Sequence, residues 1–363
     1  MGIKKKHIAI ICNYELLDSR VGGMDYFFWA FNKQCEANQI KVDWFFPNTA
    51  SHGNYHEFHI IPSGNKSIEQ HFIDYLDTSH IQYTHIITHF VELCTSFFAE
   101  VKKCQNAKVI TVDHNPRPLK GYPLKKRLKK RLKGWLYAKH IDVFVGVSEY
   151  TSQAILNDFG DFLKPKTQTI YNGILIDNIT PKTTERQKLR PRFLVVSHLR
   201  ASKGIQDLIA AVNLLRDALK SVLKIDIYGD GPYKKDLLQL VTKYKLGSNF
   251  NFKGSQSNLN ALYQHYDYLI QPTHMECFSL SILESLAANI PVITTPVGGN
   301  LEVITPNCNG FIFKTKDVKG LSELLAEIME GKRYILGNTR TLIENKFSID
   351  LMVENHLKLI NNG

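Results

Sequence analysis

The sequence lacks several features that would place it in a broad class at once. No apolar run approaches the roughly 18 residues that a membrane-spanning helix needs. Residues 1–12 begin with basic residues, and only a short apolar run follows them. A signal peptide needs a longer apolar region, so this pattern favours a core strand. The 6 cysteines are scattered over 363 residues without a Cys-x-x-Cys pair, which excludes a disulfide scaffold and favours a reducing compartment. We therefore expect a cytoplasmic protein with a large buried core.

Acidic residues are absent from one long stretch. Residues 114–141 contain no Asp or Glu but ten basic residues, so the net charge of +11 is almost entirely local. Leucines and Trp135 recur there at helical spacing. The basic side chains that surround this apolar stripe are Lys125, Lys126, Arg127, Lys129, Lys130 and Arg131. We expect a helix whose apolar stripe packs on the core and whose other face is strongly cationic.

The cationic face has three possible interpretations. It is a solvated surface, a docking surface for anionic lipid headgroups or a lipid-linked phosphate, or a nucleic-acid surface. Nucleic acid is disfavoured because no interleaved aromatic residues and no binding motif accompany the charge.

Strand-like runs alternate with amphipathic helical patterns along the whole chain. Such a succession predicts mainly parallel sheets in an α/β fold. The alternation stops in the polar stretch 176–191 and then resumes. A single (β/α)8 barrel would not need a central linker. We therefore predict two Rossmann-like, doubly wound domains facing a cleft, with residues 1–175 in the first and residues 192–345 in the second.

Polar residues follow two strand-like runs of the second half. The first run leads into a loop that holds His198, Arg200 and Lys203, whose positive charges suit a diphosphate. The second leads into a loop that holds Glu276 and then into a helix that contains Glu284. The backbone N–H groups at this helix start, at Phe278, Ser279 and Leu280, favour a phosphate. Neither a Gly-x-Gly-x-x-Gly fingerprint nor an Asp-x-Asp motif is present in the chain.

The order of the motifs in residues 193–330 carries a resemblance to a known family. The motifs are Lys203-Gly204, Gly229–Pro232, Phe252-Lys-Gly254, Glu276 and Glu284 with seven residues between them, Pro291-Val292, Gly298-Gly299 and Asn309-Gly310-Phe311. In this order they resemble the nucleotide-sugar-binding domain of retaining, GT-B-type glycosyltransferases of family 4 (glycosyl transferases group 1). The first half resembles the family more loosely, in Gly22-Gly23 and in the Asn172-Gly173 that precedes the linker.

The resemblance implies an activity and a role for each motif. A nucleotide-diphosphate sugar would bind the second domain, with Glu284 on the ribose and Glu276 on the transferred sugar. Lys203 and Arg200 would offset the negative charge on the leaving diphosphate. The reaction would need no divalent metal and no other cofactor. His198 stands where the family usually has Arg, so the sequence leaves open which of His198 and Arg200 takes that role.

The resemblance also implies roles for the first domain. Gly22 and Gly23 would let donor and acceptor approach the backbone, and His114 would lie near the donor sugar. A structural hydrogen bond is the competing interpretation of His114. The final helix, residues 346–363, would cross back onto this acceptor-binding domain.

The sequence thus predicts a hexosyltransferase that acts in bacterial cell-surface polysaccharide synthesis, such as lipopolysaccharide or capsule. The resemblance implies a UDP-sugar in preference to a GDP-sugar as the donor. Together with the cationic helix it implies a lipid-linked glycan at the inner face of the membrane as the acceptor. A sugar-nucleotide epimerase or hydrolase, and a non-catalytic basic membrane-binding protein, remain as alternatives. The donor sugar, its nucleobase, the acceptor, the linkage and the oligomeric state are not readable from the sequence.

Overall fold

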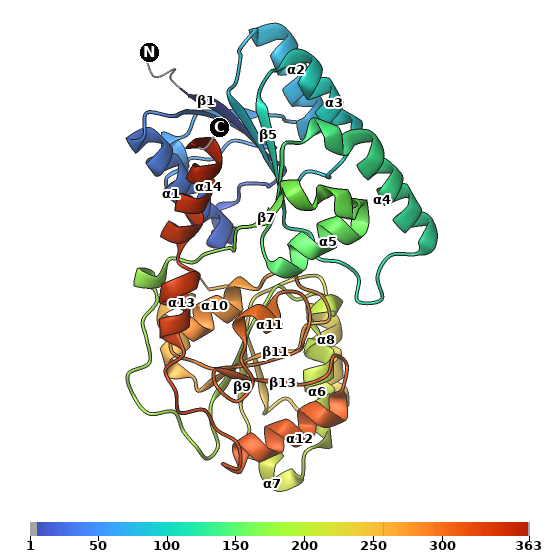
Figure 1. The fold of residues 1–363 in the computed structure, drawn as a ribbon. Coiled ribbons are helices and arrows are strands. Elements are labelled where there is room, and N and C mark those ends of the chain that lie inside the picture. The colour runs from blue at the N-terminus through green and yellow to red at the C-terminus, as the bar shows by residue number, and fades with distance from the viewer. Residues whose placement is uncertain (1–5, 257, 362–363) are drawn as a thin grey trace. The chain divides into compact units, whose positions relative to one another are not determined.

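The computed structural model describes residues 6–256 and 258–361. The chain forms two compact units (Figure 1). The first unit runs to Gly173 and includes the residues from Ile349 onward, and the second unit comprises Ile174–Ser348. Each unit has its own parallel sheet with helices around it, which is the α/β architecture expected from the sequence.

The first unit has a seven-stranded parallel sheet in the order β3-β2-β1-β4-β5-β6-β7. Its strands are β1 (His7–Cys12), β2 (Lys41–Phe46), β3 (Ile60–Pro62), β4 (His85–His89), β5 (Lys108–Asp113), β6 (Val143–Gly146) and β7 (Thr167–Thr169). Its helices are α1 (Gly23–Ala37), α2 (Ile68–Ser79), α3 (Ser96–Cys104), α4 (Leu124–Tyr137), α5 (Glu149–Phe159) and α14 (Ile349–Asn361). The central strands are buried along almost their whole length, as strands covered on both faces should be.

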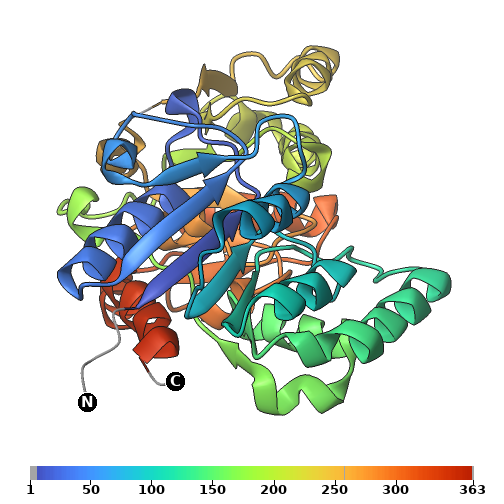
Figure 2. The ribbon, with the colours of Figure 1, turned by 90° about the horizontal axis from the view of Figure 1, so that it is seen from above.

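The last helix, α14, belongs to the first unit although the whole second unit precedes it in the chain. It packs beside α1, as both views show (Figures 1 and 2). Its His356 ring lies 4.8 Å from the ring of Phe27 on α1. Apolar side chains recur along α14 at helical spacing, and this buried stripe holds the helix in place.

The second unit has a six-stranded parallel sheet in the order β10-β9-β8-β11-β12-β13. Its strands are β8 (Phe193–Val196), β9 (Ile225–Tyr228), β10 (Phe250–Gly254), β11 (Tyr268–Gln271), β12 (Val292–Thr294) and β13 (Gly310–Ile312). Its helices are α6 (Ile205–Leu214), α7 (Asp217–Lys220), α8 (Lys234–Lys243), α9 (Leu259–Leu262), α10 (Leu280–Ala287), α11 (Asn300–Val303), α12 (Val318–Met329) and α13 (Arg340–Lys346). Chain order reverses between β8 and β11, the point at which open α/β sheets bind ligands outside the carboxyl ends of the strands.

The stretch expected to be a linker, residues 176–191, is fixed to the second unit by specific hydrogen bonds. The backbone N–H of Lys182 donates to Ala288, and the Arg186 guanidinium donates to the Asn289 carbonyl at 2.7 Å. The Gln187 N–H donates to buried Asp267 at 3.0 Å. Apart from one short 3-10 turn at Ile176–Asn178, the stretch forms neither helix nor strand.

The orientation predicted for the basic helix is wrong. Helix α4 lies at the outer edge of the first unit beside α5 (Figures 1 and 2). Its apolar stripe faces solvent. The residues of this stripe are Leu124, Leu128, Leu132, Trp135 and Leu136, and we call them the α4 ridge. Their side chains are 68%, 62%, 56%, 72% and 39% exposed, respectively.

The opposite face of α4 packs on the unit, for a steric and an electrostatic reason. Gly134 is buried so close to α5 that a Cβ would lie 2.3 Å from the carbonyl oxygen of Phe159. Lys130 donates to Asp158 at 3.0 Å, and Lys133 donates to Glu92 at 2.6 Å. Lysine stems and a glycine thus form the packed face. Among residues 6–256 and 258–361, no helix is both long enough and apolar enough to cross a membrane.

Candidate functional site

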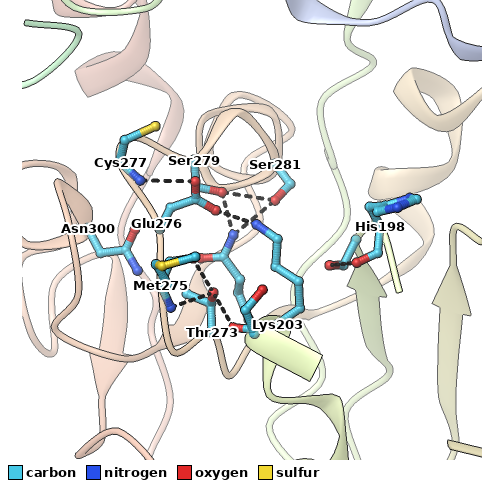
Figure 3. Close-up of polar contacts among 12 residues, drawn as sticks. His198, Lys203, Thr273, Met275, Glu276, Cys277, Ser279, Ser281 and Asn300 are labelled. Carbon is cyan, nitrogen blue, oxygen red and sulfur yellow. Dashed lines mark hydrogen bonds and ion pairs between the residues drawn. The ribbon is translucent and has the colours of Figure 1, made fainter. Parts of the chain in front are cut away.

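Two predicted site residues of the second unit form an ion pair. The Lys203 ammonium donates to the Glu276 carboxylate at 2.6 Å, and both side chains are partly exposed (Figure 3). The other Glu276 oxygen accepts from the backbone N–H of Cys277 at 3.1 Å. Lys203 precedes α6 and Glu276 follows β11, so the pair joins the loops after the two strands where the chain order reverses.

Two motif glycines allow these loops to approach each other. Gly204 has a φ of +71°, and a Cβ there would lie 1.8 Å from the carbonyl oxygen of Pro272. Gly298 has a φ of +58°, and a Cβ there would lie 2.2 Å from the carbonyl oxygen of Glu276. Any other residue at either position would therefore push a loop away from the carboxylate. The glycines of the motif position Glu276 from both sides.

Hydrogen bonds that were not anticipated from the sequence support the same two loops. The His274 N–H donates to Ser202, and His274 Nε2 lies 2.6 Å from an Asp207 carboxylate oxygen on α6. Buried Asn300 donates to Thr294 Oγ1 and to the Thr295 carbonyl, both at 3.1 Å. No sequence motif distinguishes these polar residues from ordinary loop residues.

No side chain caps the start of α10, where the sequence predicts a phosphate-binding site. Ser279 is the N-cap residue, and its side chain does not cap the helix. The first turn contains no acidic residue, so its N–H groups keep their partial positive charge. The Ser279 hydroxyl instead accepts from Gln271 on β11. The Phe278 ring is buried 5.5 Å from Phe347, so Phe278 can meet a ligand only through its backbone.

Glu284 lies one turn into α10, where Tyr263 donates to its carboxylate at 2.8 Å. Desolvation raises the pKa of this carboxyl to about 7, although the tyrosine hydrogen bond acts in the opposite direction. A carboxylate accepts hydrogen bonds from two neighbouring hydroxyls better than a neutral acid does. Its affinity for a diol should therefore depend on pH near neutrality.

We expect nucleotide affinity to rise between pH 6 and pH 8. Glu284 is mostly protonated below its pKa of about 7 and mostly ionised above it. The dissociation constant for UDP should fall by up to about tenfold over this interval. Titration calorimetry at each pH measures the effect, and Glu284→Gln is the control because it cannot titrate. An equal pH dependence in the variant would show that another group, such as the nucleotide phosphate, is responsible.

His198 and Arg200 follow β8 on the same loop as Lys203, and both are exposed. The structure brings neither side chain into a hydrogen bond with the ion pair that would assign it the arginine role. The backbone N–H of Arg200 donates to the His198 carbonyl at 2.9 Å, which fixes the turn between them.

The glycine pair of the first unit begins α1. Gly22 is the N-cap residue, and its N–H donates to Asp25 at 2.9 Å. A Cβ on Gly22 would meet nothing within 4 Å, so no protein atom requires a glycine there. Asp25 is buried and also accepts from Tyr55 at 2.6 Å. The open space beside Gly22 would accommodate a ligand.

His114 lies just beyond β5 in the first unit and is buried. Its Nε2 is 3.0 Å from Nδ1 of His89, and its ring stacks on Phe90 with a centroid distance of 4.3 Å. Burial and the nearby His356 lower the pKa of His114 to about 3. His114 is therefore uncharged at neutral pH, where it can form hydrogen bonds but carries no positive charge.

A cavity of about 440 Å³ opens in the first unit at the carboxyl ends of β1, β4 and β5. Asn13, Phe90 and Asn115, which follow these three strands, line it, and Tyr122 and Lys126 close it from the side of α4. Carboxylates, amides, lysines and aromatic rings all contribute to its wall. Such a mixed lining suits a ligand rich in hydroxyl groups.

Comparison with known proteins supports the resemblance. Residues 177–347 match the model of the family Glycosyl transferases group 1. The matched region contains Lys203, Glu276 and Glu284. The resemblance expected from the motif order is confirmed for this part of the chain.

Curated relatives and a solved structure extend the similarity. The N-acetyl-alpha-D-glucosaminyl L-malate synthase of Bacillus anthracis is 26% identical over 190 residues, covering 49% of each chain. A GDP-mannose-dependent monoacylated alpha-(1-6)-phosphatidylinositol monomannoside mannosyltransferase of Corynebacterium glutamicum is 29% identical, covering 59% of this chain and 60% of its own. The chain spans only about half the length of the first of these relatives.

The structure of Anabaena HepE in complex with UDP covers 99% of this chain and 100% of its own at 15% identity, with a TM-score of 0.77. The GT-B fold predicted from the sequence is thereby confirmed.

Proposed function

We propose that the chain is a retaining glycosyltransferase that moves a hexose from a nucleotide-diphosphate sugar to a hydroxyl group of an acceptor. The Lys203–Glu276 ion pair carries this proposal, because it lies beside the uncapped start of α10. Glu284 lies one turn further along this helix. A cation, a helix N-terminus and two carboxylates together match a diphosphate flanked by a sugar and a ribose.

Each residue has a role that follows from its chemistry. Glu284 accepts hydrogen bonds from the ribose hydroxyls, and Glu276 accepts them from hydroxyls of the transferred sugar. When the sugar–phosphate bond breaks, negative charge grows on the diphosphate. Lys203, Arg200 and the N–H groups at the start of α10 stabilise this charge, which supplies the largest part of the catalysis. The acceptor hydroxyl then attacks from the face that the diphosphate leaves, so the anomeric configuration is retained.

The donor nucleotide is UDP in preference to GDP. Both nucleotides occur among similar proteins, since HepE was solved with UDP and the Corynebacterium relative is named for GDP-mannose. In the first unit, Gly22, Gly23 and His114 would contact the donor sugar and the acceptor, and the acceptor saccharide would occupy the 440 Å³ cavity.

The acceptor is lipid-linked, and the enzyme works at the inner face of the bacterial cell membrane in cell-surface polysaccharide synthesis. The α4 ridge supports this proposal, because an exposed row of leucines and a tryptophan is costly in water. The cationic residues around the ridge complement anionic headgroups. Lys126 belongs both to α4 and to the cavity wall, so a lipid-bound acceptor on α4 would have its saccharide near the cavity.

A donor screen in the presence of membrane lipid tests the proposal. Purified protein is incubated with UDP-sugars and GDP-sugars, with and without a lipid extract that contains the cell's glycolipid acceptors. We expect release of one nucleoside diphosphate that depends on the extract, together with a glycolipid product in which the new bond keeps the donor's anomeric configuration. Release without acceptor would indicate a hydrolase or epimerase, and no release from any donor would favour the non-catalytic alternative.

A further inference from the structure

Three histidines from separate elements meet in the core of the first unit. His89 ends β4, His114 follows β5 and His356 lies on α14, and all three are buried. The ring centroids of His89 and His114 are 5.3 Å apart, and those of His89 and His356 are 6.1 Å apart. The ring of Phe27 contacts both His89 and His356. Structural packing alone would not require three imidazoles in one place.

The histidines in this cluster are uncharged near neutral pH. Burial lowers the pKa of His356 to about 4 and, together with the other two rings, lowers the pKa of His89 well below its usual value. His114 is likewise neutral, with a pKa lowered to about 3. Each ring therefore carries one N–H and one bare nitrogen, and the hydrogen-bond partners decide which nitrogen is which.

The tautomer of His356 is set by its own helix. Its Nδ1 lies 2.8 Å from the carbonyl oxygen of Met352, which can only accept, so Nδ1 carries the proton. Its Nε2 is consequently bare, and this buried atom has no hydrogen-bond partner. His356 therefore has no N–H left to donate to the other two histidines. The remaining question is which of His89 and His114 carries the proton of the hydrogen bond between them.

The hydrogen bond between His89 and His114 couples their tautomers. Their Nδ1 and Nε2 atoms are 3.0 Å apart, and only one of the two can carry the shared proton. If His89 donates, His114 must be protonated on Nδ1. If His114 donates, its Nδ1 is a bare acceptor. The bond also fixes the ring plane of His114, and the Phe90 ring stacks on one side of it. Phe90 itself has a backbone φ of +59°. A non-glycine residue at such a φ is held there only by its surroundings.

We propose that His89 is a positioning residue: its hydrogen bond fixes the ring orientation of His114 and ties the neutral tautomer of His114 to its own, so that the ring meets the hydroxyl groups of the sugar in one geometry. The proposal rests on the role proposed above for His114, but the tautomer itself can be measured without any activity. His89 does not touch the sugar and acts only through His114.

Two variants and one matched control separate this role from packing. His89→Leu removes the hydrogen bond, and His89→Asn keeps a polar group near the position of Nδ1. His85→Leu is the control, because His85 lies on the same strand, is also buried and has a pKa lowered to about 4 by burial and nearby lysines. We expect His89→Leu to lower kcat by about tenfold or more, as for other residues that orient a functional histidine. UDP affinity should be unchanged, His89→Asn should recover most of the rate, and His85→Leu should leave kcat within about twofold of wild type.

A double-mutant comparison and a spectrum complete the test. His89→Leu added to His114→Ala should cause little further loss of kcat, because the first residue acts through the second. Nitrogen-15 NMR of the histidine side chains should show His114 as a single neutral tautomer in the wild type and as an exchanging mixture in His89→Leu. An unchanged His114 tautomer in His89→Leu would overturn the proposal even if no transfer activity is found. Additive losses in the double variant would also overturn it.

Discussion

Lys203→Ala should lower the rate of sugar transfer by about 100-fold to 1,000-fold, because it removes a positive charge that the leaving diphosphate needs. This corresponds to about 2.7–4 kcal/mol of transition-state stabilisation. Glu276→Gln should lower kcat to a similar extent, since it removes the carboxylate that pairs with Lys203 at 2.6 Å. Initial rates with saturating donor and acceptor measure both effects.

The ion pair makes the two substitutions interdependent. Each single variant leaves the other charge without its partner, so the double variant Lys203→Ala with Glu276→Gln should lose less than the product of the two single losses. Lys319→Ala is the matched control, because Lys319 is an exposed lysine of the second unit that also pairs with a glutamate, Glu323. A Lys203→Ala enzyme that keeps a third or more of the wild-type rate would exclude the proposed role of this lysine.

Replacing Leu128 and Trp135 of the α4 ridge with Glu should weaken binding to vesicles that contain anionic phospholipid by at least about 100-fold. Two large side chains that enter the acyl boundary contribute about 1.5–3 kcal/mol each, and the added negative charges repel the headgroups. Both side chains are more than 60% exposed, so the substitutions remove no packing from the core. Vesicle sedimentation at fixed salt measures the effect.

Two controls show whether the ridge or general surface chemistry is responsible. Leu336→Glu changes an equally exposed leucine (70% exposed) of the second unit and should leave vesicle binding unchanged. Lys125→Glu with Lys129→Glu should weaken binding in a salt-dependent manner, at about 1 kcal/mol for each lysine removed. Lys130 is unsuitable for this purpose because it is half of a structural ion pair with Asp158. Equal vesicle binding by the ridge variant and the wild type would rule out α4 as a membrane-docking surface.

The sequence predicted the second unit more completely than the first. Lys203, Glu276 and Glu284 follow regular βα alternation, and parallel strands bring their carboxyl ends to one edge. The proximity of Lys203 and Glu276 therefore follows from strand order, and Gly204 and Gly298 mark where the loops must approach. The contacts of Tyr263 and His274 depend on helix positions that no periodicity specifies.

The orientation of α4 shows a limit of pattern analysis. Helical spacing shows which side chains share a face, but it does not say which face packs. Here a single glycine, Gly134, permits the close approach to α5, and the Lys130 ammonium lies 4.9 Å from the centroid of the Phe159 ring beneath it. The His89–His114 bond was equally inaccessible, because it joins two strands at positions that alternation assigns to the core in any case.

Nucleotide binding by the second unit, at the loops of Lys203 and Glu276 and the start of α10, underlies the proposed transfer reaction. Titration calorimetry of UDP and GDP, with the wild type and with Lys203→Ala and Glu284→Ala, tests this without knowledge of the sugar or the acceptor. We predict that the wild type binds UDP more tightly than GDP and that each substitution weakens binding about tenfold or more, which is about 1.4 kcal/mol. Absence of binding by the wild type, with and without lipid vesicles, would contradict the account.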